Sequence, residues 1–143
     1  MARIIIDLPE YWPFTTDLHL RVTDMNYGNH LGNDALLGIL HEARCRFLHQ
    51  LGYSEMNLEG LGIIMTDSAI IYKSEAFAGE ILQIAVAAGD FNKYGFDLFY
   101  KVWNQSQNKL TAEAKTGVCT FNYQTRKLAS LPEAARRRLE NIF

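Results

Sequence analysis

RVTDMNYGNHLGNDALLGILHEAR (residues 21–44) contains the end of an extended segment, a polar loop and the start of a long apolar helix. The loop holds an acid, three amides and an imidazole: Asp24, Asn26, Asn29, His30 and Asn33. A helix start offers free backbone N–H groups and a partial positive charge, which suit an anion or a developing oxyanion. Polar side chains on a loop between rigid elements therefore predict a functional site here.

The segments on either side of the loop have clear hydrophobic periods. Residues 15–22 alternate apolar and polar side chains, which predicts a half-buried first strand. Asn33 is the expected N-cap of the helix, and Gly52 is expected to terminate it. One apolar stripe follows the helix at spacings of three and four: Leu36, Leu40, Ala43, Phe47 and Leu51.

After residue 60 the chain becomes strand-like, and only the C-terminus is again helical. Four segments are rich in β-branched and aromatic residues: Ile63–Tyr72, Glu80–Ala88, Tyr94–Trp103 and Leu110–Tyr123. A short helix is expected over Pro132–Asn141. Short connections between the strands predict an antiparallel meander that wraps around the long helix, an α+β architecture. Its exposed edges favour pairing with a second copy.

Composition limits the protein class. The chain has 143 residues, a formal net charge of −2 and a pI near 6.1, so we expect a single domain over residues 1–143. This charge gives no reason to expect a nucleic-acid or membrane partner. There is no apolar stretch of the roughly 20 residues that a membrane span needs, and no signal peptide is expected. We therefore predict a cytoplasmic protein.

The sequence also argues against several kinds of site. Cys45 and Cys119 lack metal-like spacing and are expected to be reduced thiols. His41 and His49 lie eight residues apart on the helix, without a carboxylate that completes a ligand set, so no metal site is predicted. The chain has no G-x-S-x-G elbow and no complete phosphate-binding loop.

Three segments give the chain its resemblance to a known family: the loop at residues 24–33, Glu-Ala-Arg at 42–44, and IIYKSEAFAGE at 70–80. From Thr15 to Tyr123 the chain resembles a hotdog-fold acyl-CoA thioesterase of the hydroxybenzoyl-CoA thioesterase type. The resemblance implies an antiparallel sheet of about five strands wrapped around one long central helix. It also implies hydrolysis of an acyl-CoA, or another acyl thioester, to free acid and thiol at a dimer interface. No cofactor is expected apart from the coenzyme A of the substrate, and homodimers are expected, with a homotetramer as a further option.

The predicted catalytic residues are Asp24, Asn26, His30 and, from the neighbouring subunit, Asp67. Many relatives have an Asp at the position of Asn26, and an amide cannot take up a proton. The acidic role would then fall to Asp24, to Glu42 or to Asp67.

The predicted substrate-binding residues are Gly32, Asn33, Glu42 and Lys73. Backbone N–H groups at residues 32–34 are expected to act as oxyanion donors, and Lys73 is expected to meet a phosphate of coenzyme A.

Each of these residues also has a structural interpretation. Asp24 is equally suited to forming a turn, Asn26 to a left-handed turn conformation, and His30 to a structural hydrogen bond. An ion pair with Arg46 would account for Glu42, and Lys73 suits a solvated strand end.

Two alternative functions remain open. Asp24 with His30 would suit a 3-hydroxyacyl thioester dehydratase or hydratase. An amide at position 26 favours a non-catalytic acyl-CoA-binding protein.

Overall fold

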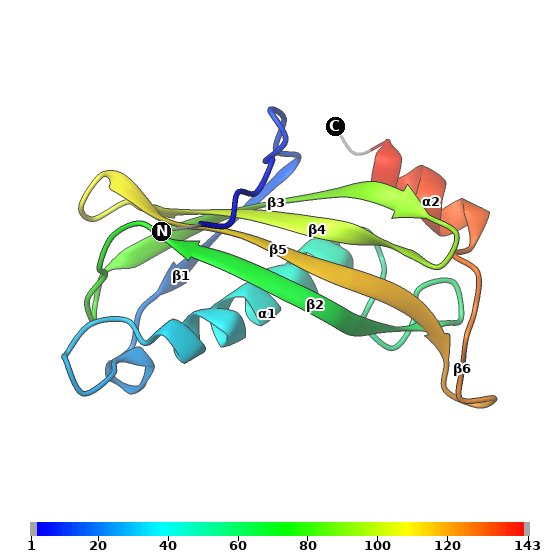
Figure 1. Cartoon of the computed structure of the whole chain (residues 1–143), viewed down its shortest axis with the longest axis horizontal. Coiled ribbons are helices and arrows are strands. Elements are labelled where there is room, and N and C mark those ends of the chain that lie inside the picture. Colours follow the sequence, from blue (N-terminus) through cyan, green and yellow to red (C-terminus); the bar gives the residue numbers. More distant parts are fainter. Residues whose placement is uncertain (1–2, 142–143) are drawn as a thin grey trace.

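An antiparallel sheet forms the larger layer of the computed structural model, which describes residues 3–141 (Figure 1). The sheet order is β1-β3-β4-β5-β2, with β6 paired to β5. The strands are β1 (Phe14–His19), β2 (Gly62–Tyr72), β3 (Ile81–Asn92), β4 (Gly95–Asn104), β5 (Lys109–Asn122) and β6 (Lys127–Leu128). The helical elements are the 3₁₀ turn η1 (Val22–Asp24), α1 (Asn33–Gln50) and α2 (Glu133–Glu140). The predicted α+β hotdog arrangement is confirmed, although the two-residue strand β6 was not predicted.

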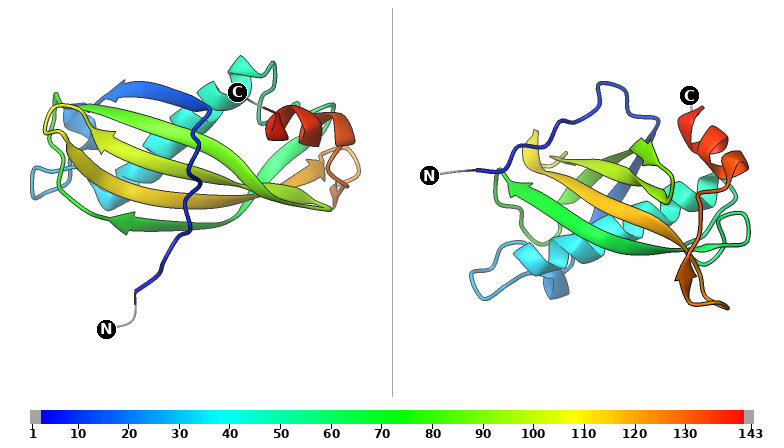
Figure 2. Two further views of the ribbon diagram at one scale, coloured as in Figure 1. Left: turned by 90° about the horizontal axis from the view of Figure 1, so that it is seen from above. Right: turned by 45° about the vertical axis from the view of Figure 1, so that its right-hand side comes forward.

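Helix α1 crosses one face of the sheet, and the N-terminal segment crosses the other (Figures 1 and 2). The 18-residue helix buries one side against the strands: Leu36, Ile39, Leu40, Ala43, Arg44, Phe47 and Leu48. Leu36, Leu40, Ala43 and Phe47 of the predicted stripe are thus buried, but one charged residue, Arg44, joins them. The opposing sheet face contributes buried side chains such as Ile84, Tyr100 and Ala114. This shared core fixes the position of the helix start against the strand ends.

The end of α1 follows the prediction, whereas its start does not. Gly52 has a φ of +82° and donates its N–H to the carbonyl of His49, while the N–H of Tyr53 reaches Leu48. These two bonds form a Schellman motif, which glycine favours because it adopts a positive φ without strain. The predicted N-cap at Asn33 is wrong, because the cap is Gly32 and Asn33 is already helical.

The first strand is shorter than predicted. It ends at His19, and Val22 is 80% exposed rather than half-buried. The reason is a local turn in which the carboxylate of Asp24 accepts the N–H of Arg21 at 2.8 Å, while the Asp24 N–H donates to the Arg21 carbonyl at 3.0 Å. Because of these short-range bonds, residues 22–24 form the turn η1 instead of extending strand β1.

The two edges of the sheet differ. Arg46 of α1 covers edge strand β1, because its guanidinium donates to Thr16 Oγ1 at 2.8 Å and to the Asp17 carbonyl at 2.9 Å. Strand β2 pairs only with β5, and its residues 65–68 are exposed. Within the described residues, β2 therefore presents an edge without a neighbouring strand. No described helix has the length and apolar character that a membrane crossing requires.

Candidate functional site

A pocket of about 660 Å³ lies between the polar loop, the start of α1 and the C-terminal end of β2. It is lined from the loop and helix by Asn26, Tyr27, Gly28, His30, Leu31, Gly32, Asn33 and Leu36, and from the sheet by Tyr72, Lys73, Ser74, Glu75, Ala76 and Thr111. We call it the helix-start pocket. Five predicted site residues line it: Asn26, His30, Gly32, Asn33 and Lys73.

The loop side of the pocket is organised by the side chain of Asn26. Its Oδ1 accepts the N–H of Gly28 at 2.9 Å and lies 3.4 Å from the N–H of His30. The left-handed conformation suggested for Asn26 is wrong, because the positive φ, 62°, belongs to Asn29. Asn26 thus forms an Asx turn that shapes the loop.

His30 has its two ring nitrogens in different surroundings. Nδ1 lies 3.2 Å from the carbonyl oxygen of Leu31 and 3.5 Å from Nδ2 of Asn26. A carbonyl oxygen only accepts, so we assign the proton to Nδ1, which leaves Nε2 with a free lone pair. A Cβ added at Gly28 would lie 3.2 Å from that Nε2, so the glycine gives the imidazole room. In this tautomer Nε2 is the ring atom available as a proton acceptor.

Only one of the three predicted oxyanion donors is free among the described residues. The Gly32 N–H donates to the Asp24 carbonyl at 3.0 Å, and the Asp34 N–H to Asn33 Oδ1 at 3.0 Å. The N–H of Asn33 has no hydrogen-bond partner within residues 3–141. Because it belongs to the first turn of α1, it also carries the positive end of the helix dipole. It is the group best suited to a developing negative charge.

The sheet side of the pocket supplies residues that were not predicted. The hydroxyl of Tyr72 donates to the Asn33 carbonyl at 2.9 Å and ties β2 to the helix start. Burial, and then the charge of Asp34, raise the pKa of Tyr72, so it remains a donor. Glu75 and Thr111 also line the pocket, and the buried hydroxyl of Thr111 has no partner among the described residues. Tyr72 and Glu75 lie in the segment that carries the family resemblance, whereas nothing in the sequence singles out Thr111.

Lys73 lies at the same strand end. Its side chain is 44% exposed, and Nζ is 3.7 Å from a carboxylate oxygen of Glu113. The long distance and the exposure make this a weak ion pair. The ammonium group is therefore available to an anion at the edge of the pocket.

Asp24 does not line the helix-start pocket. Its carboxylate is bound by Arg21, with Nη2 at 3.2 Å and the backbone N–H at 2.8 Å. Burial favours the neutral acid, but the hydrogen bonds from Arg21 outweigh it and hold the pKa of Asp24 below its ordinary value. Asp24 is thus an ionised, structurally engaged group that anchors the loop.

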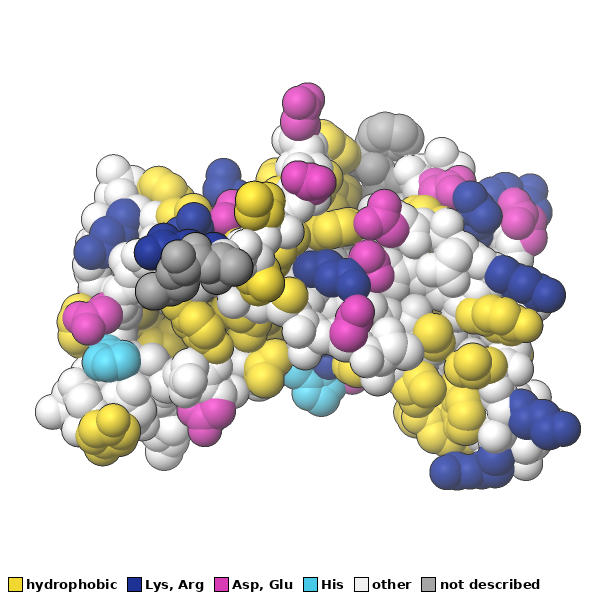
Figure 3. All heavy atoms as spheres, in the orientation of Figure 1, with side chains coloured by type: hydrophobic (Ala, Val, Ile, Leu, Met, Phe, Trp, Pro, Cys, Tyr) yellow, Lys and Arg dark blue, Asp and Glu magenta, His cyan; other side chains and the backbone are white. Residues whose placement is uncertain are grey.

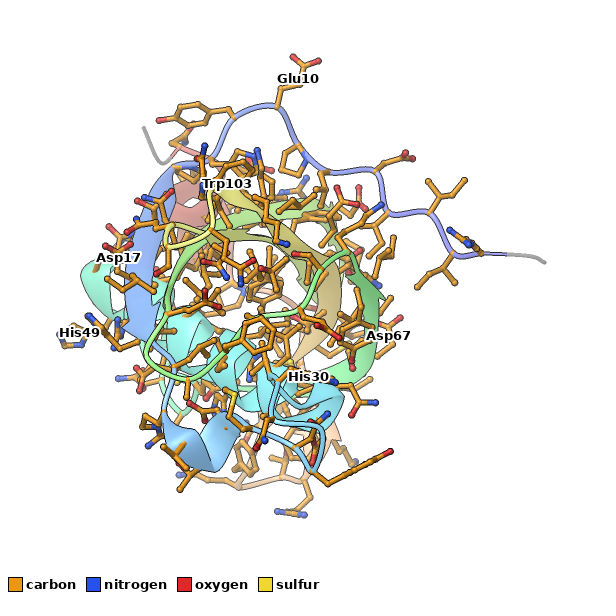
Figure 4. All side chains as sticks on the ribbon, turned by 90° about the vertical axis from the view of Figure 1, so that its left-hand side faces the viewer. Glu10, Asp17, His30, His49, Asp67 and Trp103 are labelled. Carbon is orange, nitrogen blue, oxygen red and sulfur yellow. The ribbon has the colours of Figure 1, made fainter. Side chains whose placement is uncertain are left out.

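Asp67 and Glu42 also lie outside this pocket. Asp67 is on the outer side of β2, away from His30 in Figure 4, and accepts hydrogen bonds from Lys115 Nζ at 2.9 and 3.1 Å. That contact lowers the pKa of Asp67. Lys115 Nζ also lies 3.5 Å from a carboxylate oxygen of Asp97. On the face of the molecule shown in Figure 3, positive and negative side chains are likewise interspersed. Glu42 forms the expected ion pair with Arg46 at 3.1 Å.

One of the two helix histidines, His41, has a carboxylate neighbour that was not expected. Glu55, in the loop after α1, lies beside His41 and Cys45, and the three donor atoms are within 4.8 Å of one another. This cluster is separate from the helix-start pocket. Glu55 lies beyond the end of α1, and its approach depends on how the following loop folds back, which no local pattern indicates.

Together, the curved sheet, the enclosed helix and the polar pocket at the helix start define a hotdog-type domain. The chain belongs to the thioesterase-like superfamily, whose family model matches residues 20–139. The predicted thioester hydrolase class is thereby confirmed at the level of the family. No curated protein was found to match the chain by sequence.

Solved structures of the same fold come from several bacteria. The 1,4-dihydroxy-2-naphthoyl-CoA thioesterase of Synechocystis has a TM-score of 0.81 at 19% identity, over 90% of this chain and 96% of its own. A thioesterase superfamily protein from Jannaschia has a TM-score of 0.82 at 19% identity, over 93% and 84%. A Staphylococcus aureus protein solved in complex with CoA has a TM-score of 0.80 at 18% identity, over 90% and 82%. At such identities the likeness concerns the fold.

Proposed function

We propose that this protein hydrolyses an acyl-CoA thioester in the helix-start pocket. The observation that carries the proposal is the free N–H of Asn33 in the same pocket as the imidazole of His30, whose Nδ1 lies 3.2 Å from the Leu31 carbonyl oxygen. Family membership supports the thioester class, and the CoA complex of a protein with the same fold supports the carrier. The acyl group is left open.

The pocket residues divide the chemistry between them. The Asn33 N–H binds the carbonyl oxygen as it gains negative charge, an interaction whose loss typically raises the barrier by about 2.7–4 kcal/mol. Nε2 of His30 accepts a proton from the attacking water. The departing thiol has a pKa of about 8.5, so it leaves without a strong acid. Lys73, at the edge of the pocket, binds a phosphate of coenzyme A.

A second copy of the chain completes the site in this proposal. Its support is the unpaired edge of β2, whereas the β1 edge is covered by Arg46. In an antiparallel pair across a two-fold axis, the C-terminal end of one β2 lies beside the N-terminal half of the other. Because β2 ends at Tyr72 beside the pocket, and Lys73 follows it there, the partner would then form part of the pocket wall. Further pairing of dimers into tetramers and a cytoplasmic location stay predictions.

The source of an assisting carboxylate is the open part of the mechanism. Within one chain, Glu75 is the carboxylate that lines the pocket. Asp67 would have to come from the partner subunit, and Asp24 would have to leave Arg21. We therefore include all three in the test, as Glu75→Gln, Asp67→Asn and Asp24→Asn.

The test is the release of free thiol from short, long and aromatic acyl-CoAs by purified protein at neutral pH. We expect turnover above background with one acyl class, and loss of turnover in His30→Gln but not in Cys119→Ser. The carboxylate variant that loses activity identifies the assisting acid. If no acyl-CoA in the panel is hydrolysed although acyl-CoA binds, the proposal is overturned and a non-catalytic acyl-CoA-binding protein is favoured. Hydration of an enoyl-CoA would favour the hydratase alternative.

A further inference from the structure

The strongest cluster of potential metal ligands lies apart from the helix-start pocket, where α1 meets the loop that follows it. His41 Nε2 is 2.5 Å from Glu55 Oε1, and Cys45 Sγ is 3.1 Å from the same oxygen. All three donor atoms lie within 4.8 Å of one another. An imidazole, a thiol and a carboxylate thus converge on one point.

Two independent elements hold these donors in place. His41 and Cys45 are four residues apart on α1, so they project from the same face of the helix. Glu55 belongs to a turn closed by paired backbone bonds between Ser54 and Asn57, and its carbonyl accepts the N–H of Ile63 at 2.8 Å. The convergence therefore does not depend on a single flexible side chain.

The Glu55 carboxylate is oriented by a buried guanidinium. Arg44 Nε donates to Oε2 at 3.1 Å, and its Nη1 lies 3.3 Å from the hydroxyl of Tyr100, which in turn is 2.8 Å from Thr116 Oγ1. This chain of contacts occupies one carboxylate oxygen and turns the other, Oε1, towards His41 and Cys45. Second-shell partners of this kind commonly orient metal ligands.

We propose that His41, Cys45 and Glu55 bind one divalent cation of the zinc class. Thiolate and imidazole select zinc, or cobalt as its substitute, over magnesium and calcium. With bonds of about 2.0–2.3 Å, the ligand atoms of a tetrahedral ion are roughly 3.4–3.6 Å apart. The hydrogen bonds to Glu55 thus need to open by less than about 1 Å, which side-chain rotation supplies.

The fourth coordination position has space. A second pocket, of about 580 Å³, is lined by Cys45 and Glu55 together with residues of β1 and the helix end. A water molecule in it would complete the tetrahedron. On binding, the Cys45 thiol gives its proton to solvent and its sulfur forms the bond to the ion, with no oxidation or reduction. The bound ion would cross-link the loop that contains Glu55 to α1.

The test uses tag-free full-length protein under a reductant that does not bind metal. Cobalt(II) is titrated first, because a thiolate ligand gives a charge-transfer band in the near ultraviolet, and zinc(II) is then added in competition against a chromophoric chelator. We expect one ion per chain, with displacement of cobalt by zinc. At a free zinc concentration 100-fold above the dissociation constant, the melting temperature should rise by about 8 °C.

Matched variants separate this site from adventitious binding. Cys45→Ser and His41→Gln should each weaken zinc binding by more than about 100-fold, because outer-shell changes alone weaken it 10–100-fold. Cys119→Ser and His19→Gln carry the same substitutions at the other cysteine and at a β1 histidine that does not line the second pocket, and should leave affinity unchanged. Absence of the cobalt band, or equal zinc affinity in Cys45→Ser and wild type, would overturn the proposal. His41→Gln retains the thiol, so it tests the site even if Cys45→Ser folds poorly.

Discussion

Thr111 offers a test of the pocket that does not depend on the substrate. The residue is 3% exposed on β5, and its Oγ1 has no hydrogen-bond partner within the described residues. Its backbone carbonyl, in contrast, accepts the N–H groups of Lys73 and Ser74 at 2.8 and 3.2 Å. Thr111→Val keeps these backbone bonds and the shape of the side chain, and removes only the hydroxyl.

The expected change is an increase in stability. A buried polar group without a partner costs about 1–3 kcal/mol, and valine places a methyl group where that hydroxyl was. We expect the free energy of unfolding to rise by about 1–2 kcal/mol, which corresponds to a melting temperature higher by roughly 3–6 °C. If a substrate uses the hydroxyl, the same variant should bind it more weakly.

Urea unfolding at a single protein concentration measures the change, because subunit association adds to apparent stability. The control is Thr116→Val on the same strand, where the hydroxyl is equally buried but lies 2.8 Å from that of Tyr100. That variant should lose about 1–2 kcal/mol. If Thr111→Val is destabilised as much as Thr116→Val, Thr111 has a partner in the native protein and our account of the pocket wall is wrong.

Three further predictions follow from the geometry. His30→Gln should lower kcat for thioester hydrolysis about 100-fold or more, with His49→Gln unchanged in the same assay. Asp24→Asn should lower the urea midpoint at pH 7. Because the folded pKa of Asp24 lies below its ordinary value of 3.8, the difference in midpoint from wild type should shrink as the pH falls below 3.8. A difference that stays constant with pH would contradict this. Gly95→Ala should lower the melting temperature because its Cβ would overlap the Val118 carbonyl, whereas Gly38→Ala, with open space, should raise stability by about 0.5–1 kcal/mol.

The fold was largely predictable because its signals are local. The β-branched and aromatic residues of 63–72 and the glycine at 52 act within a few residues, and β2 and the helix end formed as expected. The error at the end of β1 has a local cause: Asp24 binds Arg21 and draws residues 21–24 into a turn. Strand alternation carries no information on such a side-chain bond.

Most of the pocket residues that were predicted lie within one segment, with Lys73 from the end of β2 as the exception. Asn26, His30 and Asn33 come from the loop that the sequence marks as polar, and all three line the pocket. Thr111 reaches it because β5 pairs with β2 in a particular register, which the sequence of either strand alone does not specify. The carboxylates were the least predictable group, because whether Asp24 or Asp67 faces a pocket depends on the cation that binds it.

The central claim is that the thioester carbonyl binds the Asn33 N–H beside His30. The most direct measurement is a crystal structure with a ketone analogue of acyl-CoA, in which a methylene group replaces the thioester sulfur. The account predicts the ketone oxygen within hydrogen-bond distance of the Asn33 N–H, and Nε2 of His30 facing the carbonyl carbon through a water molecule. An analogue bound with its carbonyl outside the helix-start pocket, or turned away from Asn33, would contradict it.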